Sequence, residues 1–179
     1  MKILLHICCA PCAIYPLESI KSKNHQVKGL YFNPNIHPLE EFNKRKETLK
    51  EYAKMIDLDV VYFDDYMEEK WPSFGDKRCL NCYHIRLDFA FKYAKENGFD
   101  AVTTALLVSP YQDHELIIKI ANELSKKYQI AFYYEDFREG YRYGREVARS
   151  LGLYSQKYCG CILSRQEREA ELTLKGRTL

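Results

Sequence analysis

The chain has 179 residues, of which 46% are hydrophobic, and a formal net charge of +2 at neutral pH. A domain of this size buries roughly 70% of the surface that its unfolded chain exposes, so it needs no disulfides to hold a core. No segment approaches the roughly 20 consecutive apolar residues of a membrane-spanning helix, and the apolar run after Lys2 lacks the cleavage pattern of an export signal. We therefore expect one cytoplasmic domain over residues 1–179, with no membrane partner.

Apolar runs rich in β-branched and aromatic residues alternate with helical patterns along the chain. The runs predict strands at residues 3–7, 27–32, 60–63, 101–108 and 130–134. The helical patterns lie near residues 13–23, 38–56, 80–96, 115–127, 138–151 and 163–172. Such alternation indicates βαβ units. We predict an α/β fold with an open parallel sheet of about five strands, flanking helices and a helical C-terminal segment.

Seven cysteines fall in three tight groups, at positions 8, 9 and 12, at 79 and 82, and at 159 and 161. Structural disulfides are rare in a reducing compartment, and an odd count argues against a fully paired framework. Scattered core cysteines would not be grouped in this way. The grouping favours metal ligation or thiol redox chemistry.

The first group lies in HICCAPC, just after the first predicted strand. In open parallel sheets ligands bind beyond the carboxyl ends of the strands, beside the point where strand order reverses. A nucleotide-binding protein of this class would place a glycine-rich phosphate loop there. This loop has thiols and no glycine, which predicts a metal or redox centre instead.

The second group, in RCLNCY, gives Cys79 and Cys82 the C-x-x-C spacing of metal ligands. With Cys8 and Cys9 it makes four thiolates, which suits a structural zinc or an iron–sulfur cluster. Consecutive side chains of an extended segment diverge, so Cys8 and Cys9 fit different irons of a cluster better than one zinc ion.

The third group is YCGC, where Gly160 separates Cys159 from Cys161. A C-x-C pair can close a strained, relatively oxidising disulfide, and Gly160 would permit the tight backbone. A reversible redox pair is one interpretation, and ligation of a metal is the other. Cys12 is then left for a second thiol or metal function.

Three polar residues on the same predicted rim are weak candidates for proton transfer. His37 follows the second strand, and Asp113 and His114 follow the fourth. The alternatives are a turn residue for His37 and a helix cap for Asp113.

Residues 138–179 hold nine Lys or Arg against five Glu, with tyrosines interleaved. This composition suits a surface that meets phosphates and stacks on bases, but an ordinary solvated helix face would look the same.

Five segments together resemble the QueH family of epoxyqueuosine reductases: HICCAPC, YFNPNIHPLEEFNKR, RCLNCY, VSPYQDHE and DFREGYRYGREVARSLGLYSQKYCGC. The resemblance implies the last step of queuosine formation, in which the epoxide of epoxyqueuosine at the tRNA wobble position is reduced. It also implies an iron–sulfur enzyme without cobalamin. The family's 4Fe–4S ligands would fall on Cys8, Cys9, Cys79 and Cys82, and its redox-active pair on Cys159 and Cys161.

The order of elements is also similar to that of ATP-pyrophosphatase and related HUP-type folds. The Ser-Gly-Gly phosphate loop of that group is absent here, so we expect no ATP chemistry. Two alternative functions stay open: a zinc-stabilised RNA-binding module without catalysis, and a thiol-transferring tRNA-modification enzyme.

Removal of an epoxide oxygen as water consumes two electrons and two protons, whereas a 4Fe–4S cluster passes one electron at a time. The second electron would come from the Cys159/Cys161 dithiol or through an additional mononuclear iron held with Cys12, and an external donor must supply the equivalents. The tRNA base must leave its stack to reach a recessed site. GYRYGR is the predicted RNA contact, through Tyr141, Arg142, Tyr143 and Arg145.

Overall fold

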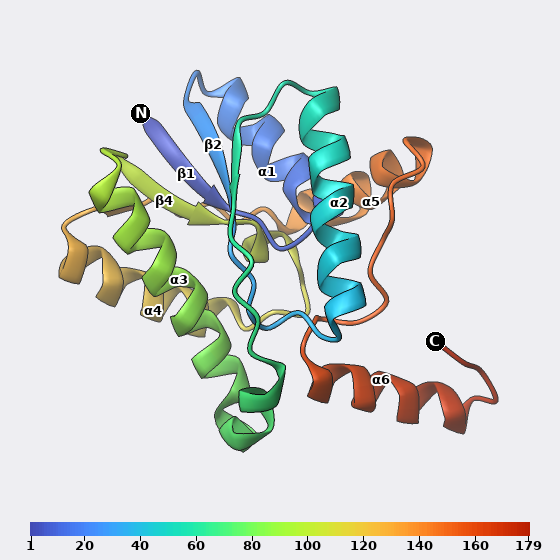
Figure 1. Cartoon of the computed structure of the whole chain (residues 1–179). Helices are drawn as coiled ribbons and strands as arrows, with labels where there is room; N and C mark the ends of the chain where they lie inside the picture. Colours follow the sequence, from blue (N-terminus) through green and yellow to red (C-terminus); the bar gives the residue numbers. More distant parts are fainter.

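The computed structural model describes residues 1–179 and is built on one five-stranded sheet (Figure 1). Every neighbouring pair of strands is parallel, and the strand order is β3-β2-β1-β4-β5. The strands are β1 (Lys2–His6), β2 (Gln26–Tyr31), β3 (Val60–Tyr62), β4 (Ala101–Thr104) and β5 (Ala131–Phe132). The predicted α/β fold with an open parallel sheet is therefore confirmed.

Helices cover both faces of this sheet. Figure 1 shows α1 (Ala10–Ser22), α2 (Leu39–Met55) and α5 (Tyr141–Ser150) on one side, and α3 (Arg78–Glu96) and α4 (His114–Tyr128) on the other. Helix α6 (Ile162–Leu174) lies beyond the sheet, as the predicted helical C-terminal segment. Three 3₁₀ segments complete the chain: η1 (Glu68–Lys77), η2 (Ala105–Val108) and η3 (Arg138–Gly140). None of the helices combines the length and the apolar character needed to cross a bilayer.

Several element boundaries differ from the predictions, and two of the differences shape the rim of the sheet. The strand expected over residues 101–108 ends at Thr104, whose hydroxyl accepts a hydrogen bond from the Leu106 amide (3.2 Å) and starts η2. Helix α1 begins at Ala10, three residues early, because proline is well suited to a first helical turn and Pro11 stands there. Cys12 consequently lies in the first turn of α1.

The strand order reverses between β1 and β4, whose ends pair at His6 and Thr104. The loops that follow these two strands therefore border the crevice in which ligands of such sheets bind. The cysteine-bearing loop after β1 stands at this point, as the sequence predicts.

Helix α5 is held against the same rim by a close approach to α1. A Cβ added at Gly144 would lie 2.9 Å from the carbonyl oxygen of Pro11, closer than real Cβ contacts. Glycine is thus required for α5 to pack at the start of α1. This packing brings the basic helix beside the cysteine loop.

Candidate metal centre and active-site cleft

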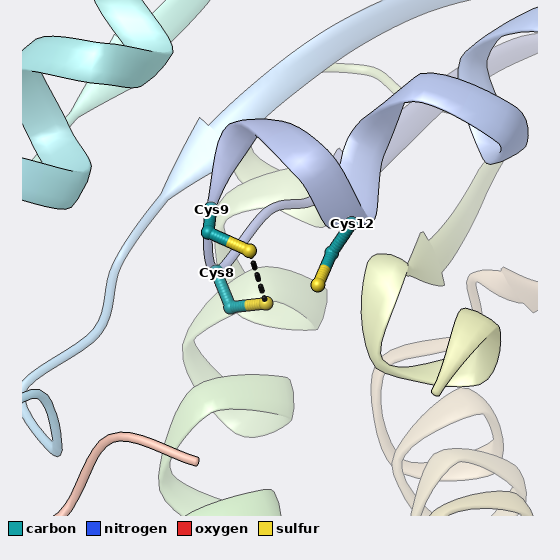
Figure 2. Close-up of side chains that lie close together, drawn as sticks. All are labelled: Cys8, Cys9 and Cys12. Atoms are coloured by element: carbon teal, nitrogen blue, oxygen red, sulfur yellow. Dashed lines mark hydrogen bonds between the residues drawn. The ribbon is translucent and has the colours of Figure 1, made fainter. Parts of the chain in front are cut away.

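The three N-terminal cysteines gather their sulfur atoms at the carboxyl end of β1 (Figure 2). Cys8 follows the strand, Cys9 caps α1 and Cys12 lies in its first turn. The three Sγ atoms all lie within 4.8 Å of one another, and those of Cys8 and Cys9 are 3.8 Å apart. The expectation that Cys8 and Cys9 diverge is wrong, because the chain bends at Cys8 and is not extended through both residues. This thiol triad could hold a metal.

The thiols of the triad do not ionise alike. Hydrogen bonds from Cys12 and Cys9 hold the pKa of Cys8 well below its usual range, against the opposing effect of burial. The pKa of Cys12 is raised well above the ordinary value, since its thiol donates to Cys8. Burial raises the pKa of Cys9. The first thiolate of the metal-free triad therefore forms at Cys8, and a metal bound there would displace the protons of the other two thiols.

Arg86 supplies the positive charge opposite these sulfurs. Its side chain is 2% exposed, and its Nη2 donates to Cys82 Sγ at 3.0 Å while Nε donates to the Cys82 carbonyl at 3.2 Å. No carboxylate forms an ion pair with it. A buried guanidinium stays charged, and burying it without an anion costs several kcal/mol. Ionisation of the Cys82 thiol on binding a metal would supply the negative charge that Arg86 lacks.

The other four cysteines lie at the start of α3 and at the start of α6 or just before it. Cys79 and Cys82 stand in the first turns of α3, and Cys161 caps α6. Cys82 and Cys161 pack with the buried indole of Trp71, and burial raises the pKa of Cys82 to about 12. All seven thiols are free, so Cys159 and Cys161 form no disulfide here. Cys79 and Cys82 lie outside the compact triad.

A cleft of about 1070 Å³ reaches from the thiol triad to the loop before α6. Cys8 and Cys12 line it from the triad, Cys159 lines it from the loop before α6, and Arg86 lies between them in its wall. Cys159 also accepts a hydrogen bond from Gln112 (3.4 Å), and Cys12 one from Gln156 (3.5 Å). Thiols from two of the three motifs therefore face one space, namely Cys8 and Cys12 of HICCAPC and Cys159 of YCGC, whereas neither cysteine of RCLNCY lines it.

The YCGC loop is held in place by Arg45, which is 1% exposed. Its Nη1 and Nη2 donate to the carbonyls of Cys159 (2.9 Å) and Tyr158 (3.1 Å), while its Nε pairs with Glu41 at 2.7 Å. Gly160 of this loop is tightly packed, since an added Cβ would lie 3.3 Å from Asn35 Nδ2. The position of Cys159 is thus fixed by a buried ion pair.

His37 also holds the YCGC loop, and with Arg45 and Glu41 it forms what we call the clamp. Its Nδ1 accepts from the Ile162 amide (3.0 Å), its Nε2 donates to the Pro34 carbonyl (3.0 Å), and its own amide donates to the Gly160 carbonyl (2.8 Å). The ring is fully buried, and burial lowers its pKa. Both ring nitrogens are occupied, so its hydrogen bonds give His37 a structural role and do not support proton transfer.

The other two proton-transfer candidates also lie off the cleft lining. Asp113 caps α4 by accepting from the Leu116 amide at 3.0 Å, which is the alternative role considered for it. His114 is 9% exposed, and its Nε2 lies 3.1 Å from the Ser109 carbonyl.

The predicted RNA segment divides between two faces of α5. Tyr141, Arg142 and Arg145 line the cleft. Tyr143 does not: its hydroxyl donates to Glu18 at 3.2 Å and its ring packs edge-on against Tyr15, with centroids 6.3 Å apart.

Sequence reasoning missed several residues of the site. Arg86 stands four residues after Cys82, on the same helix face, which is a signal that could have found it. Arg45 and Glu41 have the spacing of an ordinary surface pair on an amphipathic helix, so nothing in the sequence marks them as buried. Gln112, Gln156 and Tyr111 lie in loops and carry no pattern.

Fold and site together define a parallel-sheet α/β protein with a cysteine triad that could hold a metal at its switch point. Residues 3–167 match the family model described as epoxyqueuosine reductase QueH. The QueH of Thermotoga maritima is 32% identical, with 97% of this chain and 96% of the relative covered. The QueH of Dehalococcoides mccartyi is 33% identical, with 93% and 94% covered. The chain belongs to the QueH family.

A solved structure supports the fold alone. The predicted subunit of tRNA methyltransferase from Methanocaldococcus jannaschii superimposes with a TM-score of 0.52 over 99% of this chain and 90% of that chain, at 14% identity.

Proposed function

We propose that this protein is an oxidoreductase that reduces the epoxide of epoxyqueuosine in the anticodon of a tRNA, the last step of queuosine formation. The observation that carries the proposal is the thiol triad at the floor of a cleft whose volume is that of a large ligand pocket. The names of the relatives supply the substrate. We further propose that residues 1–179 act as one QueH-type domain in the cytoplasm.

The donor set fits an iron–sulfur centre. Three sulfur atoms within 4.8 Å of one another, and a buried Arg86 that contacts Cys82 Sγ and has no carboxylate partner, favour a thiolate-bound metal. The proposed 4Fe–4S ligands are Cys8, Cys9, Cys79 and Cys82, and a bound cluster would supply electrons singly. Because Cys12 joins Cys8 and Cys9 in the triad, it is the proposed ligand of a mononuclear iron, or of the cluster itself.

The balance of the reaction assigns a role to the loop before α6. Two electrons and two protons convert the epoxide to the alkene and water. In the dithiol version Cys159 and Cys161 lose two electrons and two protons as they form a disulfide, and an external electron donor reduces that disulfide afterwards. Cys159 is exposed to the cleft and Cys161 is buried behind it, so the first thiol would meet the substrate side.

Anaerobic reconstitution with iron and sulfide tests the proposal. We expect roughly four irons per chain. With an added reductant, the protein should convert epoxyqueuosine-tRNA to queuosine-tRNA, and mass spectrometry of the nucleosides measures this conversion. No cobalamin and no ATP should be needed. Replacement Cys159→Ser should retain the iron and lose turnover. Unchanged turnover would remove the dithiol from the chemistry.

Two alternatives have distinct outcomes. Tight zinc at one ion per chain, with no iron after anaerobic reconstitution, would favour a zinc-stabilised RNA-binding module. Turnover that depends on ATP would favour a thiol-transferring tRNA enzyme.

A further inference from the structure

Tyr111 is an aromatic side chain that the fold does not use. It is 81% exposed, although it lines the cleft. Its ring meets the ring of Tyr141 edge-on, with centroids 5.9 Å apart and an interplanar angle of 78°. Tyr111 comes from the loop before α4 and Tyr141 begins α5, so two distant segments place an aromatic pair at the same opening. An exposed ring gains little from burial, and its flat face is free for a ligand.

The arginines of α5 beside this pair are also unused. Arg142, Arg145 and Arg149 line the cleft and take part in no ion pair. The neighbouring arginines differ: Arg138 pairs with Asp136 at 2.5 Å, and Arg168 with Glu171 at 2.6 Å. The guanidinium of Arg145 lies 5.8 Å from the centroid of the Tyr141 ring. The cleft wall thus keeps three arginines without an ion-pair partner, although Glu146 and Glu171 also line it.

A second depression adjoins the cleft. It has a volume of about 390 Å³ and is lined by Arg145, Arg149, Gly152, Leu153 and Ser155. Arg145 and Arg149 are four residues apart on one face of α5 and line both hollows. Two planar guanidinium groups on one face suit the oxygens of a phosphate.

We infer that the cleft mouth is a two-part nucleotide site, in which Tyr111 and Tyr141 stack the displaced base and Arg145 with Arg149 hold a neighbouring RNA phosphate. This inference rests on the proposed function, since it takes the substrate to be an RNA loop. A base that leaves its stack needs a replacement surface, which aromatic side chains and arginine supply. The thiols of Cys8, Cys12 and Cys159 line the same cleft, so a base held at the mouth can extend a substituent toward them.

Binding of an RNA hairpin tests the base subsite without cofactor or turnover. The probe is an anticodon stem-loop with 2-aminopurine at the wobble position, whose fluorescence is quenched by stacking. Replacement Tyr111→Ala should weaken binding about tenfold, as the loss of one base–aromatic stack does, and should reduce the quenching. Tyr111→Phe should retain both signals, because the ring remains.

Tyr143 provides the matched control. It is 45% exposed and lies on α5, but it is bonded to Glu18 outside the cleft. Replacement Tyr143→Ala should leave affinity and quenching unchanged. Tyr111 is exposed, so thermal melting should show both variants to be folded as the wild type is.

The phosphate subsite is tested by the salt dependence of the same binding. Replacement Arg149→Gln should lower the slope of log affinity against log salt by about 0.7, the value for one phosphate contact on a single strand. Arg138→Gln removes the same charge from a paired arginine and should leave the slope unchanged.

The inference is overturned if Tyr111→Ala binds and quenches as the wild type does, or if Tyr143→Ala loses as much. Its failure can be told from that of the proposed function. Reduction of the epoxide by a protein whose Tyr111→Ala variant binds normally would leave the reductase standing and remove the stacking site. If the reconstituted protein binds RNA through Tyr111 but never reduces the epoxide, the stacking site stands and the proposed reductase activity is removed.

Discussion

The two sides of the cleft each contain a buried arginine, and the two are balanced in different ways. On the side of the YCGC loop, Arg45 pairs with Glu41 and bonds two backbone carbonyls. On the side of the thiol triad, Arg86 faces sulfur atoms and has no carboxylate. The charge of Arg45 is neutralised by a carboxylate of the same chain. The charge of Arg86 is balanced only when a neighbouring thiol ionises. The Arg45 side is therefore a structural clamp, and the Arg86 side suits the proposed metal site.

The largest effect that separates the two sides is loss of the metal. Replacement Cys8→Ser removes the one stabilised thiolate of the triad, and we expect iron content after anaerobic reconstitution to fall close to zero. Cys159→Ser, on the opposite side, should keep its iron. Equal iron in both variants would show that the triad is not the metal side.

The next effect is on stability, and it belongs to the clamp. Replacement Arg45→Leu leaves Glu41 buried without its partner, which should lower the free energy of unfolding by about 3–5 kcal/mol. The measurement is urea denaturation of the metal-free protein. Arg165→Gln breaks an exposed pair of the same i,i+4 type with Glu169, and should cost less than about 0.5 kcal/mol. Similar losses in both variants would contradict the burial argument.

A smaller effect should appear in the reactivity of Cys8 in metal-free protein. Hydrogen bonds from Cys12 and Cys9, and the charge of Arg86, lower the pKa of Cys8. Its thiolate is therefore present above this lowered pKa and reacts with iodoacetamide below the ordinary cysteine pKa of about 8.5. Replacement Arg86→Leu removes one lowering influence, so the alkylation profile should shift to higher pH. Mass spectrometry of Cys8-containing peptides measures the shift, and Arg86→Lys should partly restore the original profile.

The smallest expected effect concerns the ion pair between Arg78 and Glu167, which joins α3 to α6 at 2.6 Å. The Glu167 side chain is 60% exposed, so Glu167→Gln should change the free energy of unfolding by at most about 1 kcal/mol. Iron content and turnover should not change. A large loss of iron would mean that this surface contact positions the outer cysteines.

Much of the architecture follows from the sequence, because the period of apolar residues and the chain order of strands and helices are local properties. They predict the parallel sheet, and they place HICCAPC at the switch point between β1 and β4, where the structure has it. The place of His6 at the end of an apolar run is typical of a core residue. Its ring lies between Thr104 and the Phe32 carbonyl, and its pKa is lowered to about 4 chiefly by burial.

The grouping of the thiols depends on a backbone detail. Spacing suggested that Cys8 and Cys9 point apart, but one bend in the chain at Cys8 brings their sulfur atoms together and adds Cys12. The conformation of the few residues between β1 and α1 decides this outcome, and hydrophobic periodicity carries no information about it.

The sequence by itself determined the fold class, the family resemblance and the identity of the sulfur ligands available to a metal, because these depend on residue types and on local order. Only the tertiary structure decided which side chains share the cleft. Arg45 and Glu41 look like surface charges until α2 packs beneath the YCGC loop, and Tyr111 looks like any loop tyrosine until it meets Tyr141. Contacts between residues far apart in the chain arise from packing, which no local pattern records.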